Sequence, residues 1–547
     1  MSARRAAILE LLLTATVAGC TSGGEDAVTC ADLPEPVVEA TVEGAEAWVF
    51  YGIPETWGED QVLPVRPGMA DDRSMRALGG IPVVDVFTEQ GGVALMNTSD
   101  SLEPFRVLVT SDGDRTTLCA SGGSRMERIE HEGDFFTALR EYASRMAEQG
   151  IATRPAPDWV FEPHWETYGF EEDFDAQDIL DLVPLLQELG VGSITLDSGW
   201  YGRGRGEDWE SMTGDFPVNP DVIGTEEDLR ELIRTLHREG FHVRLWWVPG
   251  VAEEETEVAE AHPDWLLTPV ESSTGDTADI YLDPTRPEVV EWNRDLVARL
   301  LGYGADGFKQ DDVYEVISDE PAVHRAYSGL FHDIFEHAAA IQPNVGINTC
   351  NCGVAQNVYD FPGENMLITS DPVGSRQLRM RARIYRALDL GGAALLGDHV
   401  ELTRGDVGGD ELDEPGFYDS VDFASIVPLG LVLQTKLRGD PGELYRTWFA
   451  LYRDYRFFDM EWVDIPYFGG VERYLLRDGD DLVFSFFSET PQDAVTLDHL
   501  TPGQSYSVVE LPTEDHLLDI APSGDTYELD VRLENSLVLA VLAADGG

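Results

Sequence analysis

The chain is poor in basic residues, and above all in lysine. Only Lys309 and Lys436 are lysines, and arginine supplies the rest of the 37 basic side chains. Against them stand 102 acidic residues, which give a formal net charge of −65. A charge of that sign excludes nucleic acid as a natural partner and disfavours anionic membrane surfaces. Because the acidic residues are spread along the whole chain, they predict a strongly solvated surface.

Long apolar runs are missing after the N-terminus, where no segment stays apolar for the roughly 20 residues that a membrane-spanning helix needs. The N-terminus itself has Arg4 and Arg5, an apolar run over 8–17 interrupted by Glu10, and then Cys20. This order predicts a secretory signal over residues 1–20 and resembles a bacterial lipoprotein signal, whose cysteine is lipidated. We therefore expect an exported cell-envelope lipoprotein, periplasmic or extracellular, held to a membrane only through Cys20. An ordinary cleaved signal is the alternative.

Cysteine is scarce as well, with five in the chain. Cys30 and Cys119 bracket one region, and export makes a disulfide between them plausible. Cys350 and Cys352 lie too close in sequence to bridge well, and their spacing does not match a zinc site. The sequence also lacks a phosphate-binding loop and a Ser-His-Asp order. No metal and no cofactor are therefore implied.

Three regions of different periodicity follow the signal. Residues 28–130 alternate apolar and polar positions and are rich in turns, which predicts an N-terminal β-sandwich. Residues 155–445 alternate short apolar strands with helical stretches, which predicts an α/β fold of the (β/α)8 TIM barrel type. Residues 465–545 alternate again and predict a smaller C-terminal β-sandwich.

Seven barrel strands are clearly indicated and an eighth less clearly: 159–162, 193–197, 243–248, 307–311, 345–348, 366–371, 394–398 and the vicinity of 431–433. Helices are expected over 135–149, 179–189, 226–238, 288–301 and 377–388. Several predicted strands end on a polar residue: Glu162, Asp197, Asp311, Asn348, Asp371 and Asp398. In such barrels that rim carries the chemistry.

The stretch 305–312 stands out because it ends a predicted strand on two carboxylates. Side chains alternate along a strand, so Lys309 and Asp311 point to the same side and Asp312 to the other. A neighbouring lysine keeps an aspartate ionised. Asp311 is therefore a candidate nucleophile, and a buried structural ion pair is the alternative.

The order of motifs along the barrel resembles glycoside hydrolase family 36, the alpha-galactosidase (melibiase) family. The matching segments include 165–170, 196–202, 208–215, 262–265, 282–289, 309–311, 369–371 and 397–400. The resemblance covers most of the chain, with a β domain before the barrel and another after it.

The resemblance implies roles for single residues. Asp311 falls on the family's nucleophile and Asp371 on its acid/base, which in a retaining glycosidase lie ~5–5.5 Å apart. Without the resemblance, Asp371 reads as a helix N-cap. Substrate contacts are expected, by resemblance or from position at the rim, from these residues: Lys309, Asp197, Trp165, Trp200, Trp246, Cys352 and His399. The tryptophans are as well explained as core residues, His399 as a structural histidine and Asp197 as a turn residue.

Some positions depart from the family's sugar-reading residues, namely Ser198, Val248, Gly250 and Thr277. Hydrolytic chemistry is therefore better supported than a preference for galactose. We expect a retaining alpha-glycosidase, most likely alpha-galactosidase-like, that hydrolyses terminal alpha-linked sugars of an oligosaccharide or glycoside by double displacement. A catalytically silent carbohydrate-binding surface protein and a transglycosylase with the same carboxylates are the alternatives. The sequence leaves the oligomeric state open.

Overall fold

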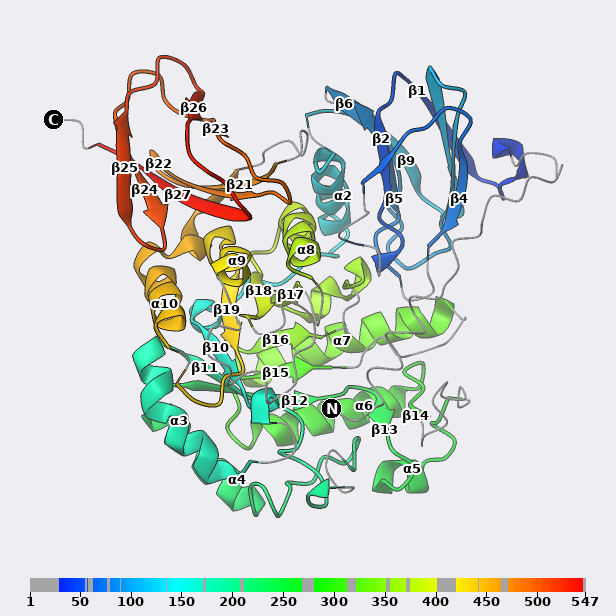
Figure 1. Ribbon diagram of the computed structural model, residues 1–547. Helices are drawn as coiled ribbons and strands as arrows, with labels where there is room; N and C mark the ends of the chain where they lie inside the picture. Colours follow the sequence, from blue (N-terminus) through cyan, green and yellow to red (C-terminus); the bar gives the residue numbers. More distant parts are fainter. Residues whose placement is uncertain are drawn as a thin grey trace.

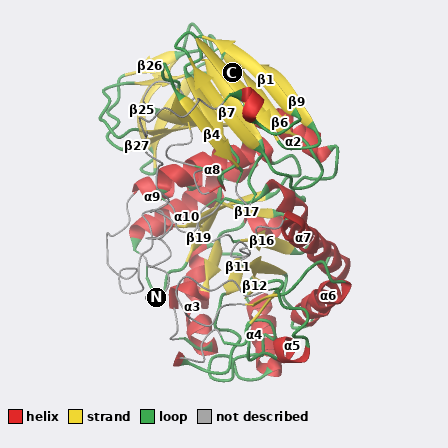
Figure 2. Ribbon diagram, turned by 90° about the vertical axis from the view of Figure 1, so that its right-hand side faces the viewer, coloured by secondary structure: helices red, strands yellow, loops and turns green. Residues whose placement is uncertain are grey.

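The computed structural model describes residues 29–544, apart from 55–56, 58–61, 76–78, 89, 134, 171–173, 207–210, 268–279, 312–320, 351–354, 370–373, 401–419, 441 and 464–470. Two β-rich regions sit on the same side of a central α/β barrel (Figures 1 and 2). The fold is thus the predicted TIM barrel flanked by β domains. Within the described residues, no helix has the length and apolar character needed to cross a bilayer.

The N-terminal region packs two antiparallel sheets face to face. One has the order β1 (Val37–Glu43), β8 (Arg115–Ser121), β7 (Arg106–Ser111), β4 (Ala70–Ser74). The other has the order β3 (Val62–Pro64), β2 (Ala47–Phe50), β5 (Val83–Thr88), β6 (Gly91–Asn97), β9 (Met126–Glu132). Trp48, Phe50 and Phe105 are buried in the core between them. The disulfide Cys30–Cys119 fastens the first described residues to β8, with the two Cα atoms 5.7 Å apart.

The barrel is a closed ring of parallel strands: β10 (His164–Glu166), β11 (Ser193–Leu196), β12 (His242–Trp247), β15 (Gly307–Gln310), β16 (Gly346–Thr349), β17 (Met366–Ile368), β18 (Ala394–His399) and β19 (Val432–Thr435). The surrounding helices include α3 (Ala176–Leu189), α4 (Glu226–Arg238), α5 (Glu257–Ala261), α6 (Pro287–Leu301), α7 (Pro321–Ile341), α9 (Ser420–Ala424) and α10 (Glu443–Tyr455). In register, Lys309 lies beside Trp246 of β12 and Asn348 of β16.

The predicted first strand, 159–162, is wrong. Residues Asp158–Phe161 form a 3-10 helix, and the strand begins at His164. Pro157 caps the short helix and Pro163 ends the segment; since proline lacks a backbone N–H, it cannot donate to a sheet ladder. Glu162 consequently is exposed and does not lie at the rim. Glu166 ends the real strand instead.

The C-terminal region has a sheet of the order β20 (Glu461–Val463), β21 (Glu472–Asp478), β22 (Asp481–Phe487), β27 (Ser536–Ala543), β24 (Tyr506–Leu511), β25 (Asp515–Ile520). A smaller pair, β23 (Val495–Leu497) and β26 (Tyr527–Leu529), accompanies it. Phe484, Phe486 and Leu539 belong to its buried core.

Helix α8 (Ser375–Leu388) joins the barrel to both β regions and lies beneath them in Figure 1. Arg379 makes a bidentate ion pair with Glu472 of β21, at 2.8 and 2.7 Å. Arg381 donates to the backbone oxygen of Trp57 in the N-terminal region at 3.1 Å. The guanidinium of Arg383 lies 4.4 Å from the ring centre of Phe136, next to α2 (Thr137–Ala147). These contacts make α8 the common support of all three regions.

Candidate active site

Lys309 is the centre of a buried charge cluster at the carboxyl ends of the barrel strands. Its side chain is 4% exposed. The ammonium donates to Glu166 Oε2 and to Asp197 Oδ2, each at 2.8 Å. Glu166 ends β10 and Asp197 directly follows β11, so three strands deliver this ion cluster to one place. Buried charged side chains thus lie at the rim of the barrel, as the polar residues at the ends of the predicted strands indicated.

Glu166 is the residue that the sequence reasoning missed as a member of the site. Its Oε1 accepts a hydrogen bond from Arg244 at 3.2 Å, and His399 Nε2 lies 3.0 Å from Oε2. Burial would raise the pKa of Glu166, but the charges of Lys309, His399 and Arg244 outweigh it and hold that pKa well below its usual range. The glutamate next to Trp165 in the family-like segment was the available signal. Placing the strand at 159–162 obscured it.

The pKa of Asp197 is shifted in the opposite direction to that of Glu166. Burial raises its pKa, and Lys309 lowers it but does not fully compensate, since Glu166 and Asp311 repel its charge. Burial would also lower the pKa of Lys309, yet Asp197, Glu166 and Asp311 together raise it well above its usual value. Lys309 is therefore a fixed cation, and neighbouring carboxyls have their pKa values pushed apart. Such divergence is typical of sites that carry acid and base chemistry.

Asp311 lies directly after β15 and is 6% exposed. Its Oδ2 accepts a hydrogen bond from Trp246 Nε1 at 2.7 Å. Lys309 donates its hydrogen bonds to Glu166 and Asp197, and its interaction with Asp311 is a longer-range electrostatic one. Trp246 instead fixes the orientation of the Asp311 carboxylate.

Trp165 and Trp200 are completely buried, which agrees with the alternative that they are core residues, and their contact with substrate stays a prediction. Trp165 Nε1 donates to the backbone oxygen of Leu437 at 2.7 Å, and Trp200 Nε1 donates to that of Trp246 at 2.9 Å. Through these hydrogen bonds the two indoles stabilise the backbone around the site. Among the predicted tryptophans, Trp246 is the one that contacts a candidate catalytic carboxylate.

The two lysines of the chain meet at one aromatic ring. Lys309 Nζ lies 5.7 Å and Lys436 Nζ lies 4.6 Å from the ring centre of Tyr168. Tyr168 also stacks on His399, with ring centres 6.1 Å apart. Lys436 directly follows β19 and is 3% exposed, so it occupies the same rim as the ion cluster. Sequence reasoning did not assign it a role, although the rarity of lysine was a signal.

Several predicted residues lie outside the described part of the chain: Asp371, Cys352, Asp312, Cys20 and Thr277. Their assigned roles stay predictions. Within the described residues, the one grouping with suitable spacing for a metal is Cys30, Glu39 and Cys119, and both sulfurs there belong to the disulfide. The described side chains at the rim are carboxylates, cations and aromatic rings, a set suited to binding hydroxyls and stabilising positive charge on a sugar.

Comparison with known proteins agrees with this arrangement. Residues 137–361 match the Melibiase family model. A relative from Flavonifractor plautii, an A type blood alpha-D-galactosamine galactosaminidase, is 25% identical over 508 residues, which are 84% of this chain and 44% of that protein. The bifunctional alpha-galactosidase/sucrose kinase of Mediterraneibacter gnavus is 29% identical over 35% of this chain and 20% of its own length. The chain therefore spans less than half the length of these curated relatives.

Solved structures match over nearly the whole chain. The alpha-galactosidase of Lactobacillus brevis has a TM-score of 0.66 and 16% identity, covering 93% of this chain and 75% of that one. The family 36 alpha-galactosidase AgaA of Geobacillus stearothermophilus has a TM-score of 0.66 and 14% identity, covering 92% of this chain and 76% of that one. At such identities the likeness establishes the fold. Through residues 137–361 this chain is thus related to the melibiase family, and its barrel with flanking β domains is the fold of the family 36 alpha-galactosidases.

Proposed function

We propose that the protein is a retaining alpha-glycosidase that removes terminal alpha-linked galactose or galactosamine residues from oligosaccharides or glycosides. The observation that carries the proposal is the position of Asp311. It is a nearly buried carboxylate at the end of β15, oriented by Trp246 and adjacent to the Lys309 ion cluster. That placement meets the requirements for a glycosidase nucleophile, namely a fixed orientation and a polar, largely dry surrounding.

In the proposed mechanism, Asp311 attacks the anomeric carbon and the bond to the leaving group breaks. Asp371 protonates the leaving oxygen, and it then removes a proton from the water that hydrolyses the glycosyl-enzyme. The two carboxyl groups would stand ~5–5.5 Å apart across the bond. Positive charge develops on the sugar ring in the transition state. The carboxylates of Asp311, Asp197 and Glu166 favour that charge.

Galactosamine is included as a substrate for two reasons. A relative that matches 84% of this chain is named an A type blood alpha-D-galactosamine galactosaminidase. The site also holds three carboxyl groups close to one another, with Lys309, Arg244 and His399 as their partners. Of these carboxyls, Asp311, which Trp246 orients, is the one that would attract an ammonium group on the substrate.

The test is turnover of aryl alpha-galactosides and aryl alpha-galactosaminides by the full chain and its Asp311→Ala variant. We expect kcat to fall more than about a thousandfold in the variant. Added azide should restore part of the turnover and give a glycosyl azide, because a small anion fits the space left by the carboxylate. Unchanged turnover in Asp311→Ala would exclude Asp311 as the nucleophile.

The lipoprotein signal supports a further part of the proposal, that the mature protein is exported and anchored in the cell envelope through Cys20. The supporting observation is the order of Arg4, Arg5, the apolar run and Cys20. A fatty-acid label should enter the wild-type protein and not the Cys20→Ala variant in a bacterial host. Equal labelling of both would contradict the anchor.

A further inference from the structure

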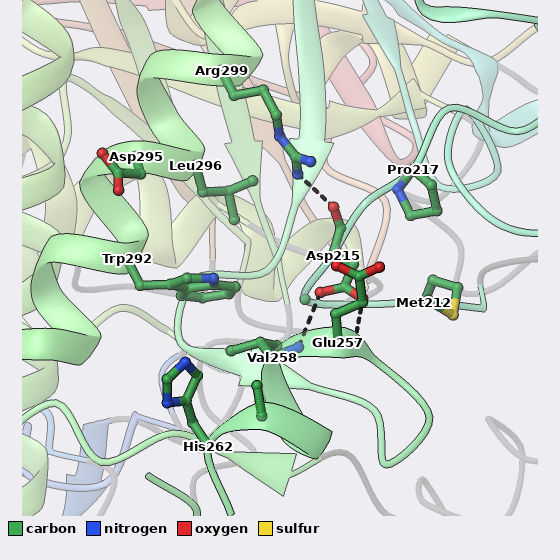
Figure 3. A pocket seen from close by; sticks show the side chains of 12 residues that line it. Met212, Asp215, Pro217, Glu257, Val258, His262, Trp292, Asp295, Leu296 and Arg299 are labelled. Atoms are coloured by element: carbon green, nitrogen blue, oxygen red, sulfur yellow. Dashed lines mark hydrogen bonds between the residues drawn. The ribbon is translucent and has the colours of Figure 1, made fainter.

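A pocket lies outside the ion cluster around Lys309. It is a pocket of about 590 Å³ walled by residues 212–217, helix α5 and helix α6 (Figure 3). The lining residues are Met212, Gly214, Asp215, Pro217, Glu257, Val258, Ala261, His262, Trp292, Asp295, Leu296 and Arg299. None of them belongs to the ion cluster around Lys309. The volume falls in the range of about 300–1,000 Å³ that small-molecule sites occupy.

Trp292 is unusual among the tryptophans of the described residues. Each of the others has a neighbouring aromatic ring or a cation over its own ring. Trp292 has neither within the described part of the chain, and its Nε1–H has no acceptor there. It packs only partly against the core and is half-buried. Trp292 therefore leaves indole surface and a hydrogen-bond donor available to the pocket.

The wall opposite Trp292 is held in place by backbone contacts. The Asp215 carboxylate accepts hydrogen bonds from the backbone N–H groups of Glu257 and Val258, at 2.5 and 3.3 Å. Arg299 donates to the backbone oxygen of Asp215, as the dashed lines in Figure 3 show. Met212, at the edge of this wall, has a φ of 73°. A residue other than glycine in that region is strained, and such strain is concentrated at functional sites.

Two carboxylates of the pocket are left available by these contacts. Glu257 and Asp295 are exposed, and neither side chain bonds to another described residue. His262 lines the pocket as well and stacks on Trp265, with ring centres 3.8 Å apart. The pocket thus combines an open indole with hydrogen-bonding groups at its edge.

The chemistry of the lining indicates the class of ligand. A half-exposed indole gives an apolar face and a donor at once, and a sugar ring presents a face of C–H groups bordered by hydroxyls. Asp215, Glu257 and Asp295 outnumber Arg299, so the charge of the lining disfavours phosphates and carboxylated ligands. We propose that this pocket is a second saccharide-binding site for neutral or amino sugars, distinct from the site where hydrolysis is proposed.

The test is calorimetric titration of the full chain carrying Asp311→Asn, which keeps the ligand intact. Raffinose should bind at two sites per chain. Adding Trp292→Ala or Asp295→Asn should weaken one of them about tenfold, which corresponds to roughly 1.4 kcal/mol, and leave the other unchanged. Galactosamine should bind to the second site at least as tightly as raffinose, and glucuronic acid more weakly.

Glu288→Gln is the matched control, because Glu288 is an exposed acid on the same helix α6 but does not line the pocket. It should leave both sites unchanged. Asp295→Asn keeps the test valid if Trp292→Ala fails to fold. Raffinose binding that neither pocket variant weakens, at one site or at two, would overturn the proposal. Tightest binding of glucuronic acid would overturn the ligand class. None of these results depends on hydrolysis, so the proposed activity stands or falls separately with Asp311→Ala.

Discussion

Strand β15 is flanked by two aspartates, Asp306 before it and Asp311 after it. The charged and hydrogen-bonding groups around the two carboxylates differ. Asp306, just before the strand, accepts hydrogen bonds from His237 Nε2 and from the backbone N–H of Val243, both at 2.8 Å, and His242 Nδ1 lies 3.5 Å away. Burial alone would raise its pKa, but these donors lower it well below the usual range. Asp311, just after the strand, belongs to a group of three crowded carboxyls. Glu166 and Asp197 bind Lys309 directly, and Asp311 interacts with it at longer range.

The difference separates a structural carboxylate, Asp306, from the proposed nucleophile, Asp311. The hydrogen bonds to Asp306 stabilise the lower end of the barrel, where the strands begin. The upper end is the rim, where the strands end. At the upper end, the pKa of Asp197 is raised because the carboxyl is buried and because its neighbours Glu166 and Asp311 are also acidic. Crowded like charges cost folding free energy, and they are kept where chemistry requires them. The carboxyl ends of barrel strands are the usual place.

The largest expected effect is at the upper end. Lys309→Met would leave Glu166 and Asp197 buried without their shared cation, so we expect the free energy of unfolding to fall by about 3–5 kcal/mol and turnover to be lost. Denaturant unfolding measures the first and aryl-glycoside hydrolysis the second. Arg234→Met is the control, because Arg234 pairs with Glu227 and Glu231 on an exposed helix face and should cost less than about 1 kcal/mol. Equal stability of the two variants would contradict the central role of Lys309.

The lower end should give stability effects without catalytic ones. Asp306→Asn would replace charge-assisted hydrogen bonds with weaker ones, and we expect a loss of about 2 kcal/mol in the free energy of unfolding. The kcat of the folded variant should stay within about twofold of wild type, since the lower end does not contact substrate in barrels of this kind. A large loss of kcat at full folding would remove the distinction between the two ends.

Part of the fold and of the charged rim could be predicted from the sequence, and part could not. Helix 226–238 was predicted with its observed bounds. In the structure, Thr225 and Asp228 form a capping box at its start. The rim positions of Asp197 and Asp311 followed from strand periodicity. Glu166 was missed because the apolar residues 159–161 resemble a strand in composition, while Pro157 and Pro163 bracket them into a 3-10 helix.

Contacts between distant segments were beyond the reach of sequence patterns. Nothing local indicates that Lys436 meets Tyr168, or that Trp292 contacts no other aromatic ring or cation in the described part of the chain, since each depends on where other elements pack. The two hydrogen bonds from Lys309 to Glu166 and Asp197 likewise form only when three strands come together.

A moderate effect is expected from the second lysine at the rim. Lys436→Met removes the cation over Tyr168 while keeping side-chain length, and cation–π contacts are worth about 1–2 kcal/mol when desolvated. We expect the free energy of unfolding to fall by that amount. We also expect KM for an aryl alpha-glycoside to rise more than kcat falls, because Tyr168 borders the site and Lys436 is not assigned to bond cleavage. Lys436→Arg restores the charge and should recover part of the KM change. A variant that lowers only kcat would place Lys436 in the chemistry itself.

The smallest expected effect is a pH dependence of folding stability that comes from His237, at the lower end of the barrel. The hydrogen bond from Asp306 raises the pKa of His237 above its ordinary value of about 6.5, against the effect of burial. The protonated histidine is therefore favoured in the folded state. Its contribution is fully present below pH ~6.5 and is lost as the pH rises through the raised folded-state pKa. His237→Gln should lower the melting temperature most at pH 6 and progressively less at higher pH. In an Asp306→Asn background the same substitution should lose this pH dependence, because the partner that raises the pKa is gone. A pH-independent difference in both backgrounds would mean that His237 stabilises the barrel by packing, and the lower end would then lack the charge pairing that sets it apart from the rim.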